Sequence, residues 1–366
     1  MLRVLALLCC VLFSLLLIVS CPSTNPPDDD GPGIGGDGDG DGDGDGDGDG
    51  DGDGDGDGDG DGDGDGDGDG EPGVPDLGVN ANLNGARPFP DDNPWNTPVD
   101  DLSVDPNSDD IIDSIGRYAN AHPDFGANWN GGPFGIPYIV VAGGTPGVEV
   151  EFQYHRESDR GPYPITSNAP IEGGPNAQGD RHILIIDRDN WLLYELFAAY
   201  PPSESGEPWI AGSGAIFGLN SNELRPEGWT SADAAGLPIF PGLVRYDEVY
   251  EQGEINHALR FTVSQTRRAY IHPATHFASS DTDPGLPPMG MRVRLKANFN
   301  ISGFTSGNQV ILRALKKYGM FLADNGSNWY ISGAPDDRWS DDDLNEIKTL
   351  EGDNFEVVQM GNAVTE

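Results

Sequence analysis

The sequence predicts a mainly β fold: a single antiparallel β-sandwich, jelly-roll-like, with a few peripheral helices. From residue 86 onward, short apolar runs alternate with polar residues in the period-two pattern of half-buried strands. Glycine and proline are scattered between these runs, as expected where many turns join short strands. Stretches with a helical period are few, which leaves strands as the main source of the core.

The clearest strand signal is the stretch 179–201, GDRHILIIDRDNWLLYELFAAYP. Two apolar runs are separated by the turn residues 188–190, which predicts a hairpin. Because side chains alternate along a strand, Glu195 shares a face with Leu193 and Phe197. A carboxylate among apolar side chains is costly unless it is paired or functional. Glu195 is therefore the first candidate for a catalytic residue.

Further strands are expected wherever an alternating apolar run is bounded by turn residues. They fall at 138–142, 148–154, 215–219, 254–263, 270–272, 291–299, 321–323, 329–331 and 355–360. Asn325-Gly326 favours a tight hairpin between the two strands that flank it. Helices are expected at 109–121, 307–318 and 341–350, where a capping residue precedes an apolar stripe, and shorter ones at 231–235 and 246–252.

Residues 1–20 are expected to be a signal peptide, because one arginine precedes a nearly unbroken apolar run that is short for a membrane span. The run ends in Leu17-Ile18-Val19-Ser20-Cys21, which resembles the bacterial lipobox. The resemblance implies cleavage before Cys21 and attachment of lipid to that cysteine. We therefore expect an exported protein at the bacterial cell surface or in the periplasm, lipid-anchored at Cys21. Ordinary signal cleavage and an uncleaved N-terminal anchor are the alternatives.

Residues 21–85 are expected to form a disordered acidic stalk. The dipeptide Asp-Gly repeats without interruption from Asp37 to Gly70, with no apolar residue to bury. Repulsion between its like charges favours an extended chain. The repeat resembles the start of an EF-hand calcium loop, but it lacks the glutamate at the twelfth position. Calcium held there would be loose, largely a counterion atmosphere.

Residues 86–366 are expected to form a single globular β-rich domain. The whole chain carries a formal net charge of −42, and outside residues 1–85 there are 40 acidic residues against 19 basic ones. A domain this acidic repels nucleic acid and anionic membrane surfaces, which leaves the lipid as the expected membrane contact. Cys9, Cys10 and Cys21 precede the domain, so it has no cysteine for a disulfide, a thiolate metal site or a nucleophile.

Several segments of the domain resemble a family of uncharacterised secreted bacterial proteins. The segments are PFPDDNPWN at 88–96, IEGGPNAQGDR at 171–181 with HILIID after it, NELRPEGWTSADAAGLPIFPGLVRYDEV at 222–249 and INHALRFT at 255–262. The resemblance covers nearly all of the domain and stops at the stalk. It implies export, but no activity and no site residues.

Histidines and arginines near the expected C-terminal strands supply partners for Glu195. His257 alternates with apolar residues, and Arg260 is close enough in sequence to pair a buried carboxylate. With His272, these residues complete the candidate catalytic set. Pro273 prevents His272 and His276 from sharing a helix face, so the zinc-protease motif is absent. His272, His276 and Asp281 could still hold a metal from a loop, and a divalent cation is the one cofactor suggested.

Tryptophans beside amide and glycine residues suggest a sugar-binding surface. Trp95 and Trp129 lie in such loops, and flat aromatic rings with nearby amides suit the CH faces and hydroxyl edges of sugars. His182, at the start of the predicted hairpin, joins them as a candidate substrate-binding residue. Ordinary anchoring of a loop by tryptophan is the alternative for each ring. Motifs for a serine hydrolase, a P-loop or a dinucleotide fold are absent.

Two classes of function stay open. One is a carbohydrate-active enzyme, a polysaccharide hydrolase or lyase that uses Glu195 with neighbouring histidines and arginines. The other is a non-catalytic surface module that binds a glycan or calcium. An enzyme requires Glu195 beside a second ionisable group in a cleft, whereas a binding module requires only exposed aromatic side chains.

Overall fold

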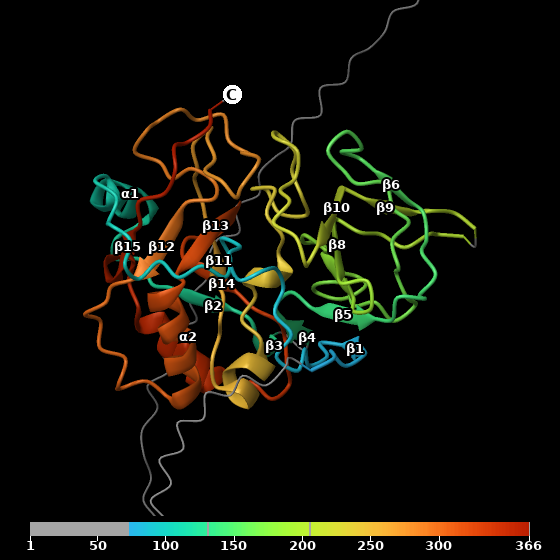
Figure 1. Cartoon of the computed structure of the whole chain (residues 1–366), viewed down its shortest axis with the longest axis horizontal. Helices are drawn as coiled ribbons and strands as arrows, with labels where there is room; N and C mark the ends of the chain where they lie inside the picture. Colours follow the sequence, from blue (N-terminus) through green and yellow to red (C-terminus); the bar gives the residue numbers. More distant parts are fainter. Residues whose placement is uncertain (1–72, 130–131, 205, 366) are drawn as a thin grey trace, which may run out of the picture. The chain divides into compact units, whose positions relative to one another are not determined.

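The computed structural model describes residues 73–129, 132–204 and 206–365 of the chain (Figure 1). Contacts divide the chain into two units, Met1–Asp67 and Gly68–Glu366, and the described residues all belong to the second. The expected signal peptide, the lipid site Cys21 and the Asp-Gly repeat lie outside the described residues. Within the described ranges, no helix is long and apolar enough to cross a membrane.

A five-stranded sheet carries the hairpin predicted at 179–201. Its strands, in spatial order, are β1 (Gly78–Val79), β5 (Tyr138–Val141), β7 (Ile183–Asp187), β8 (Leu192–Phe197) and β10 (Ser213–Gly218). β5 and β7 run parallel, and the other neighbours are antiparallel. Every residue of β7 is buried, because apolar layers cover both faces of this sheet.

The larger of the two main sheets has six strands and is drawn mostly in orange in Figure 1. Its order is β15 (Phe355–Val357), β12 (Arg292–Leu295), β13 (Met320–Asn325), β11 (Leu259–Val263), β14 (Tyr330–Ser332) and β2 (His122–Asp124). β11 pairs with β13 in parallel, as β14 does with β2. The part of the chain drawn in yellow in Figure 1 runs between the two sheets.

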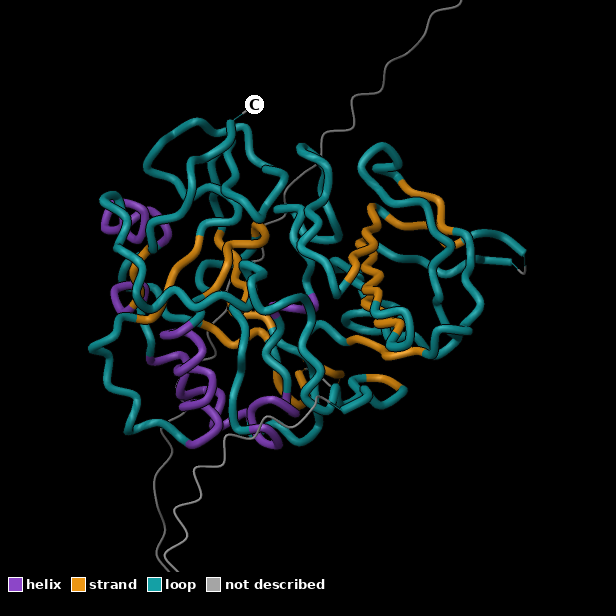
Figure 2. Tube along the Cα trace, viewed as in Figure 1, coloured by secondary structure: helices purple, strands orange, loops and turns teal. Residues whose placement is uncertain are grey.

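Smaller elements complete the fold (Figure 2). Two-stranded sheets join β3 (Gly126–Trp129) to β4 (Gly132–Phe134) and β6 (Val150–Phe152) to β9 (Trp209–Ala211). The helices are α1 (Ser108–Ile115), α2 (Ser306–Lys317) and α3 (Asp341–Leu344), with shorter turns η1 (Phe240–Gly242), η2 (Asp247–Gln252), η3 (Asn345–Thr349) and η4 (Gly352–Asn354). α2 matches the helix expected at 307–318, and η2 coincides with the short helix expected at 246–252. The helix expected at 341–350 is divided into α3 and η3. α1 ends earlier than expected, at Gly116, which adopts a positive φ.

The mainly β prediction is confirmed, but the two larger sheets are mixed, in contrast to the antiparallel arrangement expected. The hairpin predicted at Asn325-Gly326 is wrong, because β11 lies between β13 and β14 and pairs with both. The segment 270–272 forms only isolated bridges through Tyr270. No helix forms at 231–235, which is a tight loop.

The ordered fold begins before residue 86, within the segment that the sequence assigned to the stalk. β1 pairs with β5, and the side chain of Leu83 is fully buried. The Leu83 N–H also donates a hydrogen bond to the Asp247 carboxylate at 3.2 Å. Residues 73–85 therefore belong to the folded domain, because their backbone and one apolar side chain are committed to it.

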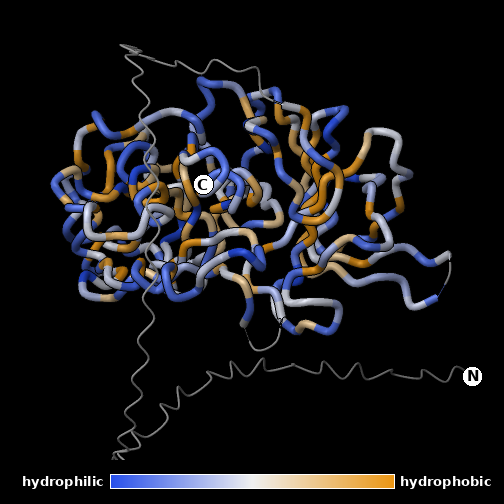
Figure 3. The backbone as a smooth tube through the Cα atoms, turned by 90° about the horizontal axis from the view of Figure 1, so that it is seen from below, coloured by the Kyte–Doolittle hydropathy of each residue, from blue (hydrophilic) through white to orange (hydrophobic). Residues whose placement is uncertain are grey.

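The core has two apolar clusters, one on each face of the five-stranded sheet. Leu184 and Ile186 of β7 face the main cluster, which extends to the six-stranded sheet, whereas Ile183 and Ile185 face the smaller one. Stretches of hydrophobic residues, orange in Figure 3, run through the inside of the folded part, and hydrophilic stretches are frequent in the outer loops. Polar groups on the inner face of β7 and β8 are therefore far from bulk water, and each requires a partner.

Candidate functional site

Glu195 points into the main core, as its alternation with apolar residues predicted. It pairs with Leu184 and Ala215 on the neighbouring strands and has no exposed surface. Both carboxylate oxygens accept the Ile239 N–H at 2.9 Å, and Oε1 also accepts the Phe240 N–H at 2.9 Å. These amides begin the turn η1. Glu195 therefore anchors η1 to β8, and it is not among the residues that line the cavity described below.

Burial raises the pKa of Glu195 to about 7, while the two backbone amides and the charges of His182 and Arg260 act to lower it. His182 and Arg260 therefore lie in the electrostatic neighbourhood of Glu195, as the sequence led us to expect, but neither is its hydrogen-bond partner. Each of them has a carboxylate of its own.

His182 is bound on both ring nitrogens. Nδ1 lies 2.7 Å from Glu172 Oε2, and Nε2 lies 3.1 Å from the carbonyl oxygen of Ala232. Both partners accept hydrogen bonds, which requires both nitrogens to donate and favours imidazolium. Burial opposes that charge, but Glu172 outweighs it and raises the pKa of His182 to about 9. His182 is 3% exposed, so it supports the 230–236 loop rather than contacting a sugar as predicted.

Arg260 on β11 binds Asp233 at two points. Nη2 donates to Oδ1 at 2.7 Å and Nε donates to Oδ2 at 3.1 Å, while Nη1 bonds the Ser332 hydroxyl of β14. Asp233 is 0% and Arg260 3% exposed. The predicted pairing of Arg260 with a buried carboxylate is thus confirmed, but the carboxylate is that of Asp233, which sequence reasoning did not single out.

A β-bulge brings Asp324 to the same place. The register of β11 with β13 skips Ala323, so that Phe261 faces Leu322 and Thr262 faces Asp324. An extra residue of this kind turns the side chain that follows it. The freed Ala323 carbonyl accepts the Ala235 N–H at 3.0 Å, which ties the strand end carrying Asp324 to the loop carrying Asp233.

The loop 228–236 holds Asp233 in place through its own hydroxyl groups. The Ser231 hydroxyl accepts the Asp233 N–H at 2.9 Å, and the Ser213 hydroxyl of β10 donates to the Ser231 carbonyl at 2.7 Å. Gly236 ends the loop with a φ of +73°. A Cβ there would lie 2.6 Å from the Trp229 carbonyl oxygen and against the Thr275 hydroxyl, so only glycine fits.

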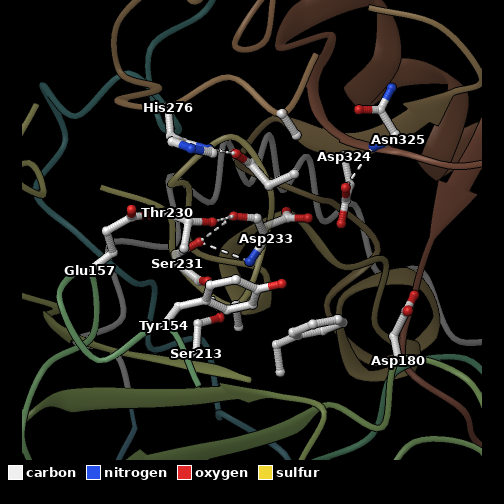
Figure 4. Close-up of a pocket in the computed structure, with 14 residues that line it drawn as sticks. Tyr154, Glu157, Asp180, Ser213, Thr230, Ser231, Asp233, His276, Asp324 and Asn325 are labelled. Atoms are coloured by element: carbon white, nitrogen blue, oxygen red, sulfur yellow. Dashed lines mark hydrogen bonds between the residues drawn. The ribbon is translucent and has the colours of Figure 1, made fainter. Parts of the chain in front are cut away.

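These segments enclose a cavity of about 450 Å³ (Figure 4). Its polar lining consists of acidic and hydroxyl side chains with one histidine and one amide: Glu157, Asp180, Asp233, Asp324, Tyr154, Ser213, Thr230, Ser231, His276 and Asn325. In the view of Figure 4, Glu157 and Asp324 lie on opposite sides of Asp233. The volume falls within the ~300–1,000 Å³ typical of small-molecule sites, and the cavity also brings together buried carboxyl groups, so we take it as the candidate functional site.

The two aspartates at the cavity wall form one titrating pair. Burial and the adjacent Asp233 carboxylate raise the pKa of Asp324 to about 8, although Arg260 acts to lower it. Burial also raises the pKa of Asp233, against the lowering effects of Arg260 and of a hydrogen bond shared with Asp324. Each of two adjacent carboxyl groups opposes the ionisation of the other, which favours retention of one proton by the pair.

The predicted metal site does not form. His272, with a half-exposed side chain, binds the Glu227 carboxylate at 2.7 Å, and Asp281 lies in an exposed turn. His276 lines the cavity, where its Nδ1 bonds the Ala234 carbonyl at 2.7 Å. Among the described residues, no group of three or more His, Cys, Asp or Glu side chains could hold a metal ion.

His257 does not join the cavity either. It is 1% exposed, with Nδ1 2.8 Å from the Ala258 carbonyl oxygen and Nε2 3.1 Å from Glu248 Oε1. Glu248 is in turn bound by Arg245 at 2.7 Å. The four candidate catalytic residues therefore do not form one site. His257 and His272 have separate partners, and only Arg260 supports the cavity wall.

The expected aromatic sugar platform is not found at Trp95. This ring is 2% exposed and packs edge-on against Phe321 with centroids 4.9 Å apart. Trp129 belongs to β3, and its side chain lies outside what the structure describes. Tyr154 and Phe197 are the aromatic residues that line the cavity.

Comparison of the chain with models of known protein families, with curated proteins and with solved structures found no match. The function must therefore be inferred from the chemistry of the cavity.

Proposed function

We propose that this chain is an exported, lipid-anchored protein whose domain binds a carbohydrate unit in the cavity and hydrolyses it with Asp324 as the general acid. The observation that carries the proposal is a cavity rich in hydroxyl and carboxylate groups, at whose wall burial and the adjacent Asp233 carboxylate raise the pKa of Asp324 to about 8. Hydroxyl and carboxylate groups recognise the hydroxyls of a sugar, and Tyr154 and Phe197 offer aromatic surface for its CH face.

The proposed reaction needs an acid and a base on different sides of the sugar. Asp324 gives its proton to the leaving oxygen as the glycosidic C–O bond breaks. A water molecule forms the new bond to the anomeric carbon, and its proton passes to a carboxylate elsewhere on the wall. Glu157 is our choice for that base, because it lies on the other side of Asp233 from Asp324 (Figure 4).

A non-catalytic glycan-binding module is the second candidate, and one observation favours it. Asp233 and Asp324 share a hydrogen bond, so they are closer than the ~5–9.5 Å that separates paired glycosidase carboxyl groups. These two groups alone therefore cannot act as acid and base. If Glu157 does not serve as the base, the cavity binds a sugar without cleaving it.

The test is a screen of the full chain, solubilised in detergent, against cell-wall and plant polysaccharides. Reducing ends report hydrolysis, and unsaturated products report a lyase. We expect Asp324→Asn to lower the release of reducing ends by ~10²–10⁴-fold while glycan binding persists. Binding without products assigns the second candidate. Unsaturated products, unchanged activity in Asp324→Asn or the absence of any glycan binding would overturn the proposal.

The anchor is tested separately through localisation. Replacing Cys21 by serine removes the sulfur to which lipid would be attached, so the chain should move from the membrane fraction to the soluble fraction. Persistent tight association of the Cys21→Ser chain with membranes would contradict the proposed lipid attachment.

A further inference from the structure

We infer that Arg260 is a positioning residue that holds Asp233 as the ionised member of the carboxyl pair and so keeps the shared proton on Asp324, the member that faces a ligand. The inference deepens the proposed function, because it explains how the acid keeps its proton. The location of that proton can, however, be measured without any ligand, so the two ideas can fail separately.

The first step is the asymmetry of donors around the two carboxyl groups. Asp233 receives two N–H groups of a guanidinium, at 2.7 and 3.1 Å. Asp324 receives one backbone N–H, from Asn325 at 2.6 Å. Hydrogen bonds from a cation stabilise a carboxylate more than those from a neutral amide. The negative charge of the pair therefore belongs on Asp233, and the proton on Asp324.

The second step is the rigidity of the arginine. Arg260 is the second residue of β11, and its remaining side-chain nitrogen, Nη1, bonds the Ser332 hydroxyl on the adjacent strand β14. Three donors with fixed partners leave the guanidinium one orientation. Exposure also differs, since Asp233 is fully buried and Asp324 is only partly so. The protonated group is thus the one within reach of a ligand.

The third step concerns the other charges around the pair. His182, a cation held by Glu172, acts on Asp233 through space, and Asp124 and Glu195 feel the charge of Arg260. The remaining ionisable groups that line the cavity are Glu157, Asp180 and His276. Among the described residues, the guanidinium that binds both oxygens of the Asp233 carboxylate is that of Arg260. Removing Arg260 should therefore alter the placement of the proton.

The experiment uses carboxyl-carbon NMR of the full chain labelled on aspartate, with Asp233→Asn and Asp324→Asn to assign the two resonances. At about pH 6, well below the pKa of about 8 for Asp324, we expect Asp324 to appear protonated and Asp233 ionised. In Arg260→Gln, Asp233 should gain a large share of the proton, so the two resonances approach each other. Arg260→Lys, which keeps the charge but not the two-point geometry, should lie between.

Arg294→Gln is the matched control, because Arg294 is also a buried arginine paired with a carboxylate, Glu356, at 2.8 Å in the same sheet but away from the cavity lining. It should leave both aspartate resonances in place. An ionised Asp324 in the unmodified chain would overturn the inference even if Arg260→Gln failed to fold. Folded Arg260→Gln and Arg260→Lys chains with unchanged resonances would overturn it as well.

Discussion

Arg260 and Asp233 form a two-point ion pair inside the protein, with Nη2 to Oδ1 at 2.7 Å and Nε to Oδ2 at 3.1 Å. The pair joins β11 of the six-stranded sheet to the loop that closes the cavity. Through it, two buried charges of the domain are connected to Asp324 at the cavity wall, whose pKa is raised to about 8 by burial and by the adjacent Asp233 carboxylate. Stability and the proposed chemistry therefore depend on the same contacts.

Breaking this ion pair should destabilise the fold strongly. Asp233→Asn removes the carboxylate that the buried Arg260 guanidinium binds at two points, and breaking a buried pair in this way is expected to cost roughly 3–5 kcal/mol in the free energy of unfolding. Asp91→Asn is the control, since Asp91 pairs with Arg87 at the surface and is 95% exposed. That change should cost less than about 1 kcal/mol. Denaturant unfolding measures both, and equal losses would contradict the assigned roles.

Glu195 should make stability fall as pH rises. Its pKa is raised from 4.5 to about 7 in the folded state, so between these values the folded chain binds more protons than the unfolded one. The contribution is complete below about pH 4.5 and is lost as pH rises through about 7, by roughly 3 kcal/mol in total. Glu195→Gln should flatten this part of the profile. A Glu195→Gln chain that follows the pH dependence of the unmodified chain would refute a raised pKa for the buried Glu195.

The Glu172–His182 pair should act in a more alkaline range. Since its pKa is raised from 6.5 to about 9, His182 contributes stability that is complete below about pH 6.5 and is lost as pH rises through about 9. Glu172→Gln should therefore destabilise more at neutral pH than above pH ~9, and histidine NMR should show a lower pKa for His182. Glu227→Gln, which removes the exposed partner of His272, should change stability by less than about 1 kcal/mol.

Alanine variants of two glycines near the cavity distinguish the effect of steric fit from the effect of backbone strain. Gly228 and Gly236 both have positive φ, at +79° and +73°, but only at Gly236 would a Cβ meet other atoms. Alanine at either position adds strain of the order of 1 kcal/mol. Gly236→Ala should in addition displace the loop that bears Asp233 and weaken glycan binding. Calorimetry measures the stability and the glycan binding of the two variants. Equal stability and equal binding would contradict this account of the loop.

Sequence reasoning located the inward direction of Glu195, because it follows from alternation along a strand. It chose Arg260 because an arginine near the predicted strands can pair a buried carboxylate. Their partners depend on tertiary contacts: the Ile239 amide and the Asp233 carboxylate are distant in sequence and lie in segments without periodicity. Asp324 was missed for a similar reason. It is an aspartate before Asn-Gly, which indicates a turn, and a bulge in a parallel strand pair has no sequence signal that would reveal it.

The same limit explains the errors in fold and site. Asn325-Gly326 has ideal hairpin chemistry, but the strand that fills the space beside β13 is β11, brought there from a distant part of the chain. Trp95 lies among loop residues in sequence, yet its ring is buried against Phe321. Local patterns therefore predicted the elements well, whereas strand order and the residues that share the cavity followed from long-range packing.

The most direct test of the central claim is glycan binding by a chain whose cavity is blocked. Ala278 lines the cavity and is exposed, so Ala278→Trp fills the space without disturbing the core, and Ala363→Trp adds the same ring at an exposed site that does not line the cavity. We predict that, by isothermal titration with the glycan identified in the screen, Ala278→Trp abolishes binding while Ala363→Trp binds like the unmodified chain. Undiminished binding by a folded Ala278→Trp chain would contradict the account.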